Sequence, residues 1–218
     1  MKLLTKDYYR WTNRRYCIAT NPETGVETKL IGYKGTTKLL NFGEPTFEEK
    51  LIAKMGPEKA AETLARVRAR GNKAHSQLEN DKTKLVNTKV LTELGTNLGD
   101  EVLVYGNILG ANIIGFIDAV YRLPSGQLCL VDWKTKKNRS SFKYYDEMGS
   151  VESYYRQLVT YAALFKALYG ETISETRVIM IYADKPLIND VYTLSQAQFP
   201  RTARYLADKV KLYLKSKT

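Results

Sequence analysis

The sequence has 218 residues, 44% of them hydrophobic and 26% charged, a composition typical of a globular protein with one sizeable core. No stretch reaches the roughly 18 consecutive apolar residues of a membrane span, so we expect no membrane partner. The formal net charge of +11 favours a polyanionic partner, and nucleic acid is the simplest one.

The two cysteines and the N-terminal segment limit cofactors and location. Cys17 and Cys129 are far apart and neither has a CxxC partner, which excludes a four-cysteine iron–sulfur cluster and argues against a zinc site. The first residues carry charges at short intervals, so they do not form the apolar core of a secretory signal. We therefore expect a cytoplasmic location, which for a phage protein would be the infected host cell. A mitochondrial presequence is disfavoured because the segment is poor in serine.

The first half of the chain predicts a hairpin followed by helices. Short β-type runs at 16–19 and 28–33 are separated by a turn sequence at 21–25. Thr46, with Glu49 three residues later, resembles a helix capping box, and Pro57 is suited to start a second helix, which could break at Gly71. Residues 81–100 are weakly patterned and are predicted to be loop with a helical turn.

The second half predicts an α/β fold with a mixed sheet. Extended runs at 101–106, 112–122 and 127–134 are followed by a helix at 153–169, two strands near 177–182 and 191–194, and a basic amphipathic C-terminal helix. This order is typical of an α/β sandwich. We expect a single domain, in which residues 1–60 form an N-terminal hairpin and helical extension, 61–195 the core and 196–218 the final helix.

A pair of aspartates flanks the predicted turn at 123–127. Pro124 and Gly126 favour a tight connection between antiparallel strands, with its midpoint near Ser125. Asp118 and Asp132 are equally far from that midpoint, so they should face each other with Cβ atoms roughly 5 Å apart. Two facing carboxylates repel each other unless a cation or a shared proton neutralises them.

Lys134 lies two residues after Asp132, hence on the same face of the same strand. Two carboxylates and an ammonium group suit phosphodiester hydrolysis, because a hard cation such as Mg²⁺ can polarise the phosphate while the lysine orients the attacking water. A surface ion pair beside a buried carboxylate would produce the same pattern by chance.

Two further features support a metal site. Gln157 and Tyr161 are four residues apart on the predicted helix, so they share one face. His75, the only histidine, could complete the metal shell, and Glu79 one turn later could contribute to a second metal. Taken singly, His75 could equally be structural and Gln157 could be a solvated helix residue.

Four motifs in this order resemble the RecB-type nucleases of the PD-(D/E)XK superfamily. They are Arg70-Gly-Asn-Lys-Ala-His75, Gly115-Phe-Ile-Asp118, Asp132-Trp-Lys-Thr135 and Gln157-Leu-Val-Thr-Tyr161. Residues 112–170 are similar to the mitochondrial genome maintenance exonuclease and to related phage exonucleases. The resemblance implies a restriction-endonuclease-like core, with a central mixed sheet flanked by helices, and covers about half of the chain.

The resemblance also implies a role for each motif residue. The metal, Mg²⁺ or Mn²⁺, would be held by His75, Asp118, Asp132 and the backbone carbonyl of Trp133, with Lys134 catalytic and Gln157 supporting it. The residues expected to contact the substrate are Arg70, Thr135, Lys136, Arg156 and Tyr161. Two departures stand out: Asn72 replaces a common threonine, and the segment at 35–37 matches the family's Ser-Val-Thr-Thr only faintly.

These features together predict a metal-dependent DNA exonuclease, acting on single-stranded or frayed ends in replication, repair or recombination. One alternative is a structure-selective, flap-type endonuclease. A second is a non-catalytic nucleic-acid-binding protein that has kept the fold, which would bind DNA with a strong dependence on salt and would bind no metal.

Overall fold

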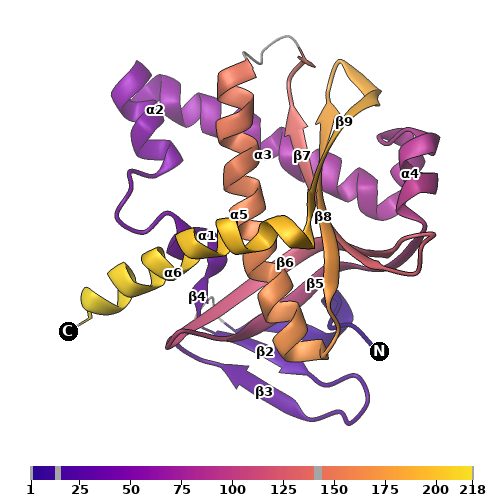
Figure 1. Cartoon of the computed structure of the whole chain (residues 1–218). Helices are drawn as coiled ribbons and strands as arrows, with labels where there is room; N and C mark the ends of the chain where they lie inside the picture. The colour runs from indigo at the N-terminus through magenta and orange to yellow at the C-terminus, as the bar shows by residue number, and fades with distance from the viewer. Residues whose placement is uncertain (1, 13–15, 140–143, 218) are drawn as a thin grey trace.

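The computed structural model describes residues 2–12, 16–139 and 144–217. Figure 1 shows an α/β arrangement in which one mixed sheet lies between helices, with a smaller sheet at one end. In chain order its main elements are β1 (Tyr9–Thr12), β2 (Tyr16–Thr20), β3 (Glu27–Leu30), β4 (Lys34–Gly35), α1 (Thr36–Leu40), α2 (Phe47–Met55), α3 (Pro57–Asn80), α4 (Thr88–Leu94), β5 (Thr96–Ile108), β6 (Ala111–Arg122), β7 (Leu128–Lys136), α5 (Tyr144–Tyr169), β8 (Ile173–Tyr182), β9 (Lys185–Ser195) and α6 (Phe199–Lys215). The fold predicted from the sequence is confirmed.

Local signals place the N-terminal elements as predicted. The hairpin of β2 and β3 turns at the predicted site, where the Asn21 side chain accepts backbone N–H groups, and β1 adds a third strand to it. Thr46 and Glu49 form a reciprocal capping box at the start of α2, because each side chain accepts the backbone N–H of the other residue. α3 begins at Pro57 and continues through Gly71 without a break.

The prediction for residues 81–100 is wrong in part. The segment contains α4, which Asn87 caps by accepting the Lys89 N–H at 2.9 Å, and the first residues of β5. Gly95 ends the helix with a φ of 74°. α5 likewise begins earlier than predicted, at Tyr144.

β6 pairs with three other strands of the larger sheet. Along one edge it pairs antiparallel with β5. Along the other it pairs with β7 at residues 119–122 and, in parallel, with β4 at residues 113 and 114. Beyond β7 the sheet continues through the parallel strand β8 to β9. Residues 115–118 of β6 lie between these two pairings, and along this edge they pair with neither β7 nor β4.

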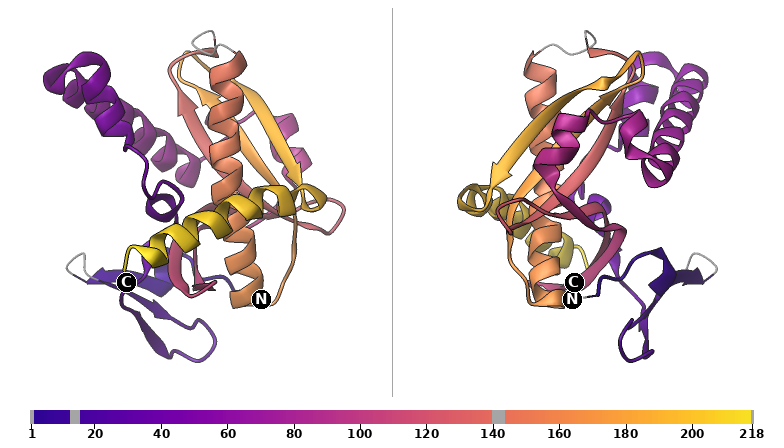
Figure 2. Two further views of the ribbon diagram at one scale, coloured as in Figure 1. Left: turned by 60° about the vertical axis from the view of Figure 1, so that its left-hand side comes forward. Right: turned by 90° about the vertical axis from the view of Figure 1, so that its right-hand side faces the viewer.

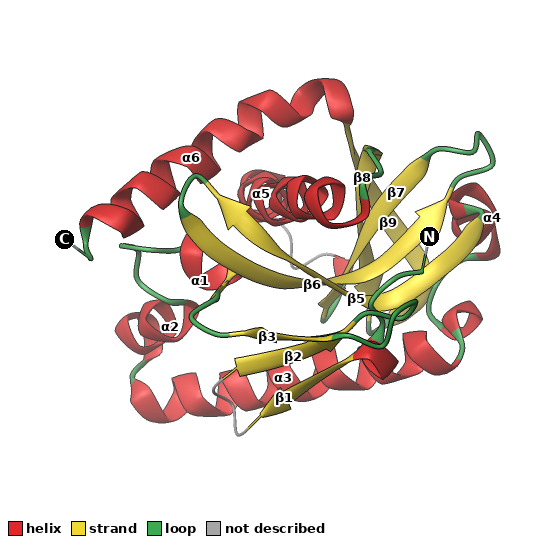
Figure 3. Cartoon of the chain, turned by 90° about the horizontal axis from the view of Figure 1, so that it is seen from below, coloured by secondary structure: helices red, strands yellow, loops and turns green. Residues whose placement is uncertain are grey.

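Helices cover both faces of this sheet, as Figure 3 shows from below. α5 and α6 pack on one face over an apolar cluster that includes Val104, Ile117, Leu130 and Phe165. α3 and α4 pack on the other face of β7 and β8, and the small N-terminal sheet packs beside β5 and β6. Farther out, α2 and the first half of α3 form a separate small cluster and extend away from the sheet (Figure 2). Among the described residues no helix combines the length and apolar character needed to cross a membrane.

A substitution at Gly115 tests the packing in the stretch of β6 that no longer pairs with β7. A Cβ atom at this position would lie 2.2 Å from Cε1 of Tyr161 and 2.9 Å from the hydroxyl of Thr36. We expect Gly115→Ala to lower the free energy of unfolding by about 1–3 kcal/mol, measured by urea denaturation, because a fixed ring and a buried hydroxyl must move. Gly71→Ala is the matched control. No atom lies within 4 Å of its new Cβ, so this helical substitution should raise stability by about 0.5–1 kcal/mol.

Candidate active site

Three neighbouring strands bring three carboxylates together. In the β6–β7 hairpin Ala119 pairs with Val131, the register that the turn around Ser125 predicts, and its next pair would be Asp118 with Asp132. In the β5–β6 hairpin the pairs Asp100–Ala119 and Val102–Ile117 place Glu101 opposite Asp118 on the other side. Asp118 is thus the central carboxylate of the three.

The backbone ladder between β6 and β7 stops at this point. Instead of pairing with backbone, the N–H of Trp133 donates to Oδ2 of Asp118 at 2.8 Å. This bond fixes the Asp118 carboxylate between the two strands. Trp133 itself is buried, with 3% of its surface exposed, so its ring anchors the backbone that carries the donor.

Glu101 is a site residue that the sequence analysis missed. Its φ of 50° is unusual for a residue with a side chain, and its carbonyl accepts the hydroxyl of Tyr9 at 3.2 Å. One carboxylate oxygen lies 3.7 Å from Nδ1 of His75 on α3. Counting outward from the Leu109–Gly110 turn would have placed Glu101 opposite Asp118, as the same count placed Asp132.

Burial and the neighbouring charges shift the pKa values of residues in the cluster. Burial and the charge of Asp132 raise the pKa of Asp118 to about 7. The neighbouring Glu101 carboxylate raises the pKa of His75, an effect that burial opposes. In the absence of a cation the cluster thus holds protons that ordinary aspartate and histidine residues would release at a lower pH.

Lys134 is bound to Asp132 on the same face of β7, as predicted. Its ammonium group donates to Oδ1 of Asp132 at 2.6 Å and lies 4.8 Å from the centre of the Tyr154 ring, a contact not predicted from the sequence. Burial lowers the pKa of Lys134, but the charges of Asp132 and Asp118 outweigh burial and raise it overall. The ammonium group therefore stays charged.

Gln157 and Tyr161 meet on one face of α5. Nε2 of Gln157 donates to the Tyr161 hydroxyl at 2.7 Å. Burial raises the pKa of Tyr161 to about 12, and the nearby charges of Asp132, Asp118 and Lys134 also act on it. This helix face therefore borders the carboxylate cluster.

The remaining predicted residues lie around the cluster or away from it. Arg70 and Thr135 line one cavity of about 280 Å³ together with Lys73 and Lys84. Lys136, at the end of β7, accepts the Ala183 N–H through its carbonyl. The guanidinium of Arg156 lies 3.7 Å from the centre of the Tyr205 ring, between α5 and α6, so it is not gathered into the cluster. Glu79 forms an ion pair with Lys6 and does not join it either.

The residues present fit a hard divalent cation. His75, Glu101 and Asp118 offer ligand atoms that all lie within 4.8 Å of one another. Oδ2 of Asp132 is buried and, within the part of the chain that is described, has no hydrogen-bond partner. Carboxylate oxygens with one imidazole are a donor set suited to Mg²⁺ or Mn²⁺, and a cation would relieve the repulsion between the carboxylates.

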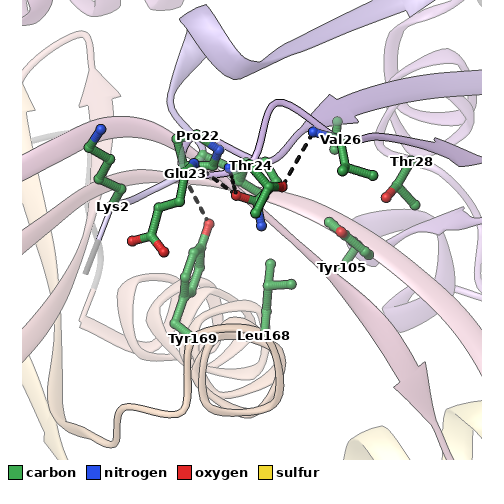
Figure 4. A pocket seen from close by; sticks show the side chains of 12 residues that line it. Lys2, Pro22, Glu23, Thr24, Val26, Thr28, Tyr105, Leu168 and Tyr169 are labelled. Carbon is green, nitrogen blue, oxygen red and sulfur yellow. Dashed lines mark hydrogen bonds between the residues drawn. The ribbon is translucent and has the colours of Figure 1, made fainter.

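Two cavities lie near this cluster and a third does not. The basic cavity with Arg70 lies on the side of α3, and a cavity of about 550 Å³ lies beside Gly115 and Tyr161. A cavity of about 490 Å³ opens between the turn at Asn21–Thr24 and the end of α5, near Tyr105 and Tyr169 (Figure 4). None of the cluster residues lines any of the three cavities, but the first is lined by Ala74, next to His75, and the second by Phe116, two residues before Asp118, whereas the third has no such neighbour.

The comparisons decide the family. The sequence model of the PD-(D/E)XK nuclease superfamily matches residues 40–216, most of the chain. The protein belongs to this superfamily. It is therefore a nuclease, and nucleases of this superfamily use divalent metal ions. Comparison with curated proteins gives no match.

One solved structure with a TM-score of 0.50 is similar in fold. A protein from Eubacterium rectale whose function is assigned as an exonuclease is 10% identical to this chain, with a TM-score of 0.50. The match covers 84% of this chain and 80% of that one. The protein SSO0001 is 18% identical (TM-score 0.48, 83% and 76% covered). A phage-related exonuclease from Haemophilus somnus 129PT is 13% identical (TM-score 0.42, 85% and 96% covered). At 10% identity the likeness to the Eubacterium rectale protein concerns the fold alone.

Asp118→Asn tests the electrostatic strain of the cluster. The amide oxygen can still accept the Trp133 N–H, but the repulsion from Asp132 is gone. In EDTA at pH 8, where the Asp118 carboxyl is mostly ionised, the variant should melt about 2–4 °C above the parent protein. The difference should shrink as the pH falls and vanish only below about 4, the ordinary pKa of an aspartate, where the carboxyl is protonated in the folded and the unfolded protein alike. Because the pKa is raised in the folded state, the parent protein loses this stability as the pH rises from about 4 to about 7.

The same thermal melts with added Mn²⁺ report on the metal. The parent protein should gain stability and Asp118→Asn should gain little. Asp208→Asn, an exposed carboxylate on α6, is the control and should respond to Mn²⁺ like the parent. An Asp118→Asn protein that melts below the parent in EDTA at pH 8 would contradict the strain assigned to Asp118.

Proposed function

We propose that this nuclease is a metal-dependent exonuclease acting on DNA, preferentially on single-stranded or frayed ends, in replication, repair or recombination, with the whole chain forming one nuclease domain. The observation that carries the proposal is the arrangement of Glu101, Asp118 and Asp132 on adjacent strands, with His75 and Lys134 beside them. This is the donor set and the cationic group that phosphodiester hydrolysis needs in one place.

Mg²⁺ or Mn²⁺ would be held by His75, Glu101, Asp118 and Asp132, with the Trp133 carbonyl as a further ligand, and would polarise the phosphate and acidify a bound water. The bond from the Trp133 N–H keeps one oxygen of Asp118 occupied and leaves its other oxygen for the cation. Oδ2 of Asp132, which has no hydrogen-bond partner among the described residues, would likewise be available to the cation.

Lys134 is the catalytic residue in this proposal. Its ammonium group is held by Asp132 and by the Tyr154 ring, so its position is fixed before the substrate arrives. It can orient the attacking water and offset the negative charge that develops on the phosphate. Gln157 supports the site by holding Tyr161, whose ring forms one wall beside Gly115.

The surroundings suit an anionic strand. Arg70, Lys73 and Lys84 give the cavity beside Thr135 a positive lining on one side of the cluster. Lys136 and Arg156 remain candidates for phosphate contacts. Arg156 would contact the substrate only by leaving its place over Tyr205.

Lys134→Ala tests the mechanism. With end-labelled single-stranded DNA and Mn²⁺ or Mg²⁺, we expect cleavage to fall by about 10²–10³-fold, because the charge beside the reacting phosphate is lost. The stabilisation by Mn²⁺ should persist, since the carboxylates remain. Lys211→Ala, an exposed lysine on α6, should cleave like the parent. Full activity of Lys134→Ala, or cleavage of equal rate in EDTA, would refute the mechanism.

A circular single strand separates exonuclease from endonuclease action. An enzyme that needs a free end should leave the circle intact while it degrades the same sequence in linear form. The products are resolved on a denaturing gel at matched metal and protein concentrations. Cutting of the circle at a rate comparable to that of the linear strand would establish endonuclease action instead.

A further inference from the structure

The cavity of about 550 Å³ beside the cluster lies against the stretch of β6 that β7 has left. We call it the aromatic cavity. Its lining comes from β1, from the segment of β4 and α1, from β6 and from α5, and includes Trp11, Lys34, Lys38, Gly115, Phe116 and Tyr161. None of the proposed metal ligands lines the cavity, but Phe116 lies two residues before Asp118 on β6, and the charges of Asp118 and Asp132 act on Tyr161, so the cavity is close to the proposed metal site.

Trp11 presents a fixed aromatic surface at this cavity. Half of its surface is exposed, an unusual state for so large an apolar side chain. Its ring lies 6.2 Å from the ring of Phe116, which in turn lies 4.9 Å from the ring of Tyr9. Phe116 thus packs against the rings of both Tyr9 and Trp11, so the indole has a packed neighbour while half of its surface remains open to a ligand.

The positive charge of the cavity favours an anion, and the exposed ring of Trp11 favours a ligand with a flat ring. Lys34 and Lys38 belong to the lining, and none of the described residues that line it is acidic. Lys38 is exposed on α1. A nucleotide of an unpaired strand has both parts, a base with two free faces and a phosphate. A base inside a duplex has its faces covered by its neighbours, so it cannot stack on Trp11.

We propose that the aromatic cavity binds an unpaired nucleobase of the DNA strand that is being cut, with the base stacked on Trp11 and the adjoining phosphates near Lys34 and Lys38. The inference rests on the proposed nuclease function and deepens it. A cavity that accepts only an unpaired base beside the metal site makes single-stranded DNA the substrate and assigns the small N-terminal sheet to substrate binding.

Tryptophan fluorescence reports on this contact without any cleavage. The chain has two tryptophans, and Trp133 is 97% buried, since only 3% of it is exposed. Quenching by a twelve-nucleotide oligo(dT) in EDTA that is present in the parent and absent in Trp11→Phe would therefore come from Trp11. We expect saturable quenching with the single strand and none with a blunt duplex of the same length.

Variants measured by fluorescence anisotropy of labelled oligo(dT) give the size of the effect. Trp11→Ala should weaken binding by about tenfold, the loss expected for one stacked base, whereas Trp11→Phe should keep most of the affinity. Lys38→Ala should reduce the slope of log K against log salt by about 0.7, the value for one phosphate contact on a single strand. Leu187→Ala, a half-exposed apolar residue on β9, is the matched control and should bind like the parent.

The outcomes separate this inference from the function beneath it. If Trp11→Ala binds oligo(dT) as the parent does while the parent cleaves DNA, the stacking site is refuted and the nuclease function stands. Saturable quenching in a protein that cleaves no DNA with any metal would support the stacking site and refute the catalytic proposal. Equal quenching by blunt duplex and single strand would overturn the preference for an unpaired base.

Discussion

The hydrogen bond from the Trp133 N–H to the Asp118 carboxylate determines how the rest of the site is arranged. A regular hairpin would have continued its ladder here, and both aspartates would have stayed in an ordinary sheet. Because the Trp133 N–H bonds to a side chain and not to the backbone of β6, β7 parts from β6 at this point and stays paired with β8. Along the same edge of β6, residues 113 and 114 pair with β4. The ring of Tyr161 lies in the gap that results, against Gly115. Gly115 is required there because any side chain would occupy the place of the ring.

The cost of this arrangement is electrostatic. Asp118 and Asp132 are close together and largely removed from water, and Lys134 neutralises only one of the charges, by bonding to Asp132. A protein selected for stability alone would replace one carboxylate with an amide. A cation held as proposed would relieve the repulsion that remains, and the electrostatic strain of the metal-free cluster would then contribute to the affinity for the metal.

Sequence patterns predict those parts of the molecule that local chemistry decides. The capping box at Thr46, the start of α3 at Pro57 and the register around Ser125 depend on neighbouring residues, and all three are confirmed. Metal binding by His75 and catalysis by Lys134 stay predictions, although both residues lie beside Asp118. The turn at Leu109–Gly110 fixes the register of Glu101 as the Ser125 turn fixes that of Asp132, but the backbone conformation of Glu101 is one that the residue type does not suggest. The environment of Arg156, over a ring of α6, depends on helix packing and has no local signal.

The small N-terminal sheet has a structural reason to be part of the site. Glu101 has a positive φ, a conformation that needs support from surrounding contacts. That support comes from the N-terminal segment, since the Tyr9 hydroxyl bonds to the carbonyl of Glu101 and the Leu4 carbonyl accepts the N–H of Leu103. Tyr9 also packs on Phe116, which backs Trp11 at the aromatic cavity. The same few residues therefore position a carboxylate of the proposed metal site and one wall of the aromatic cavity, so a strand held on Trp11 would be placed in a fixed relation to the proposed metal.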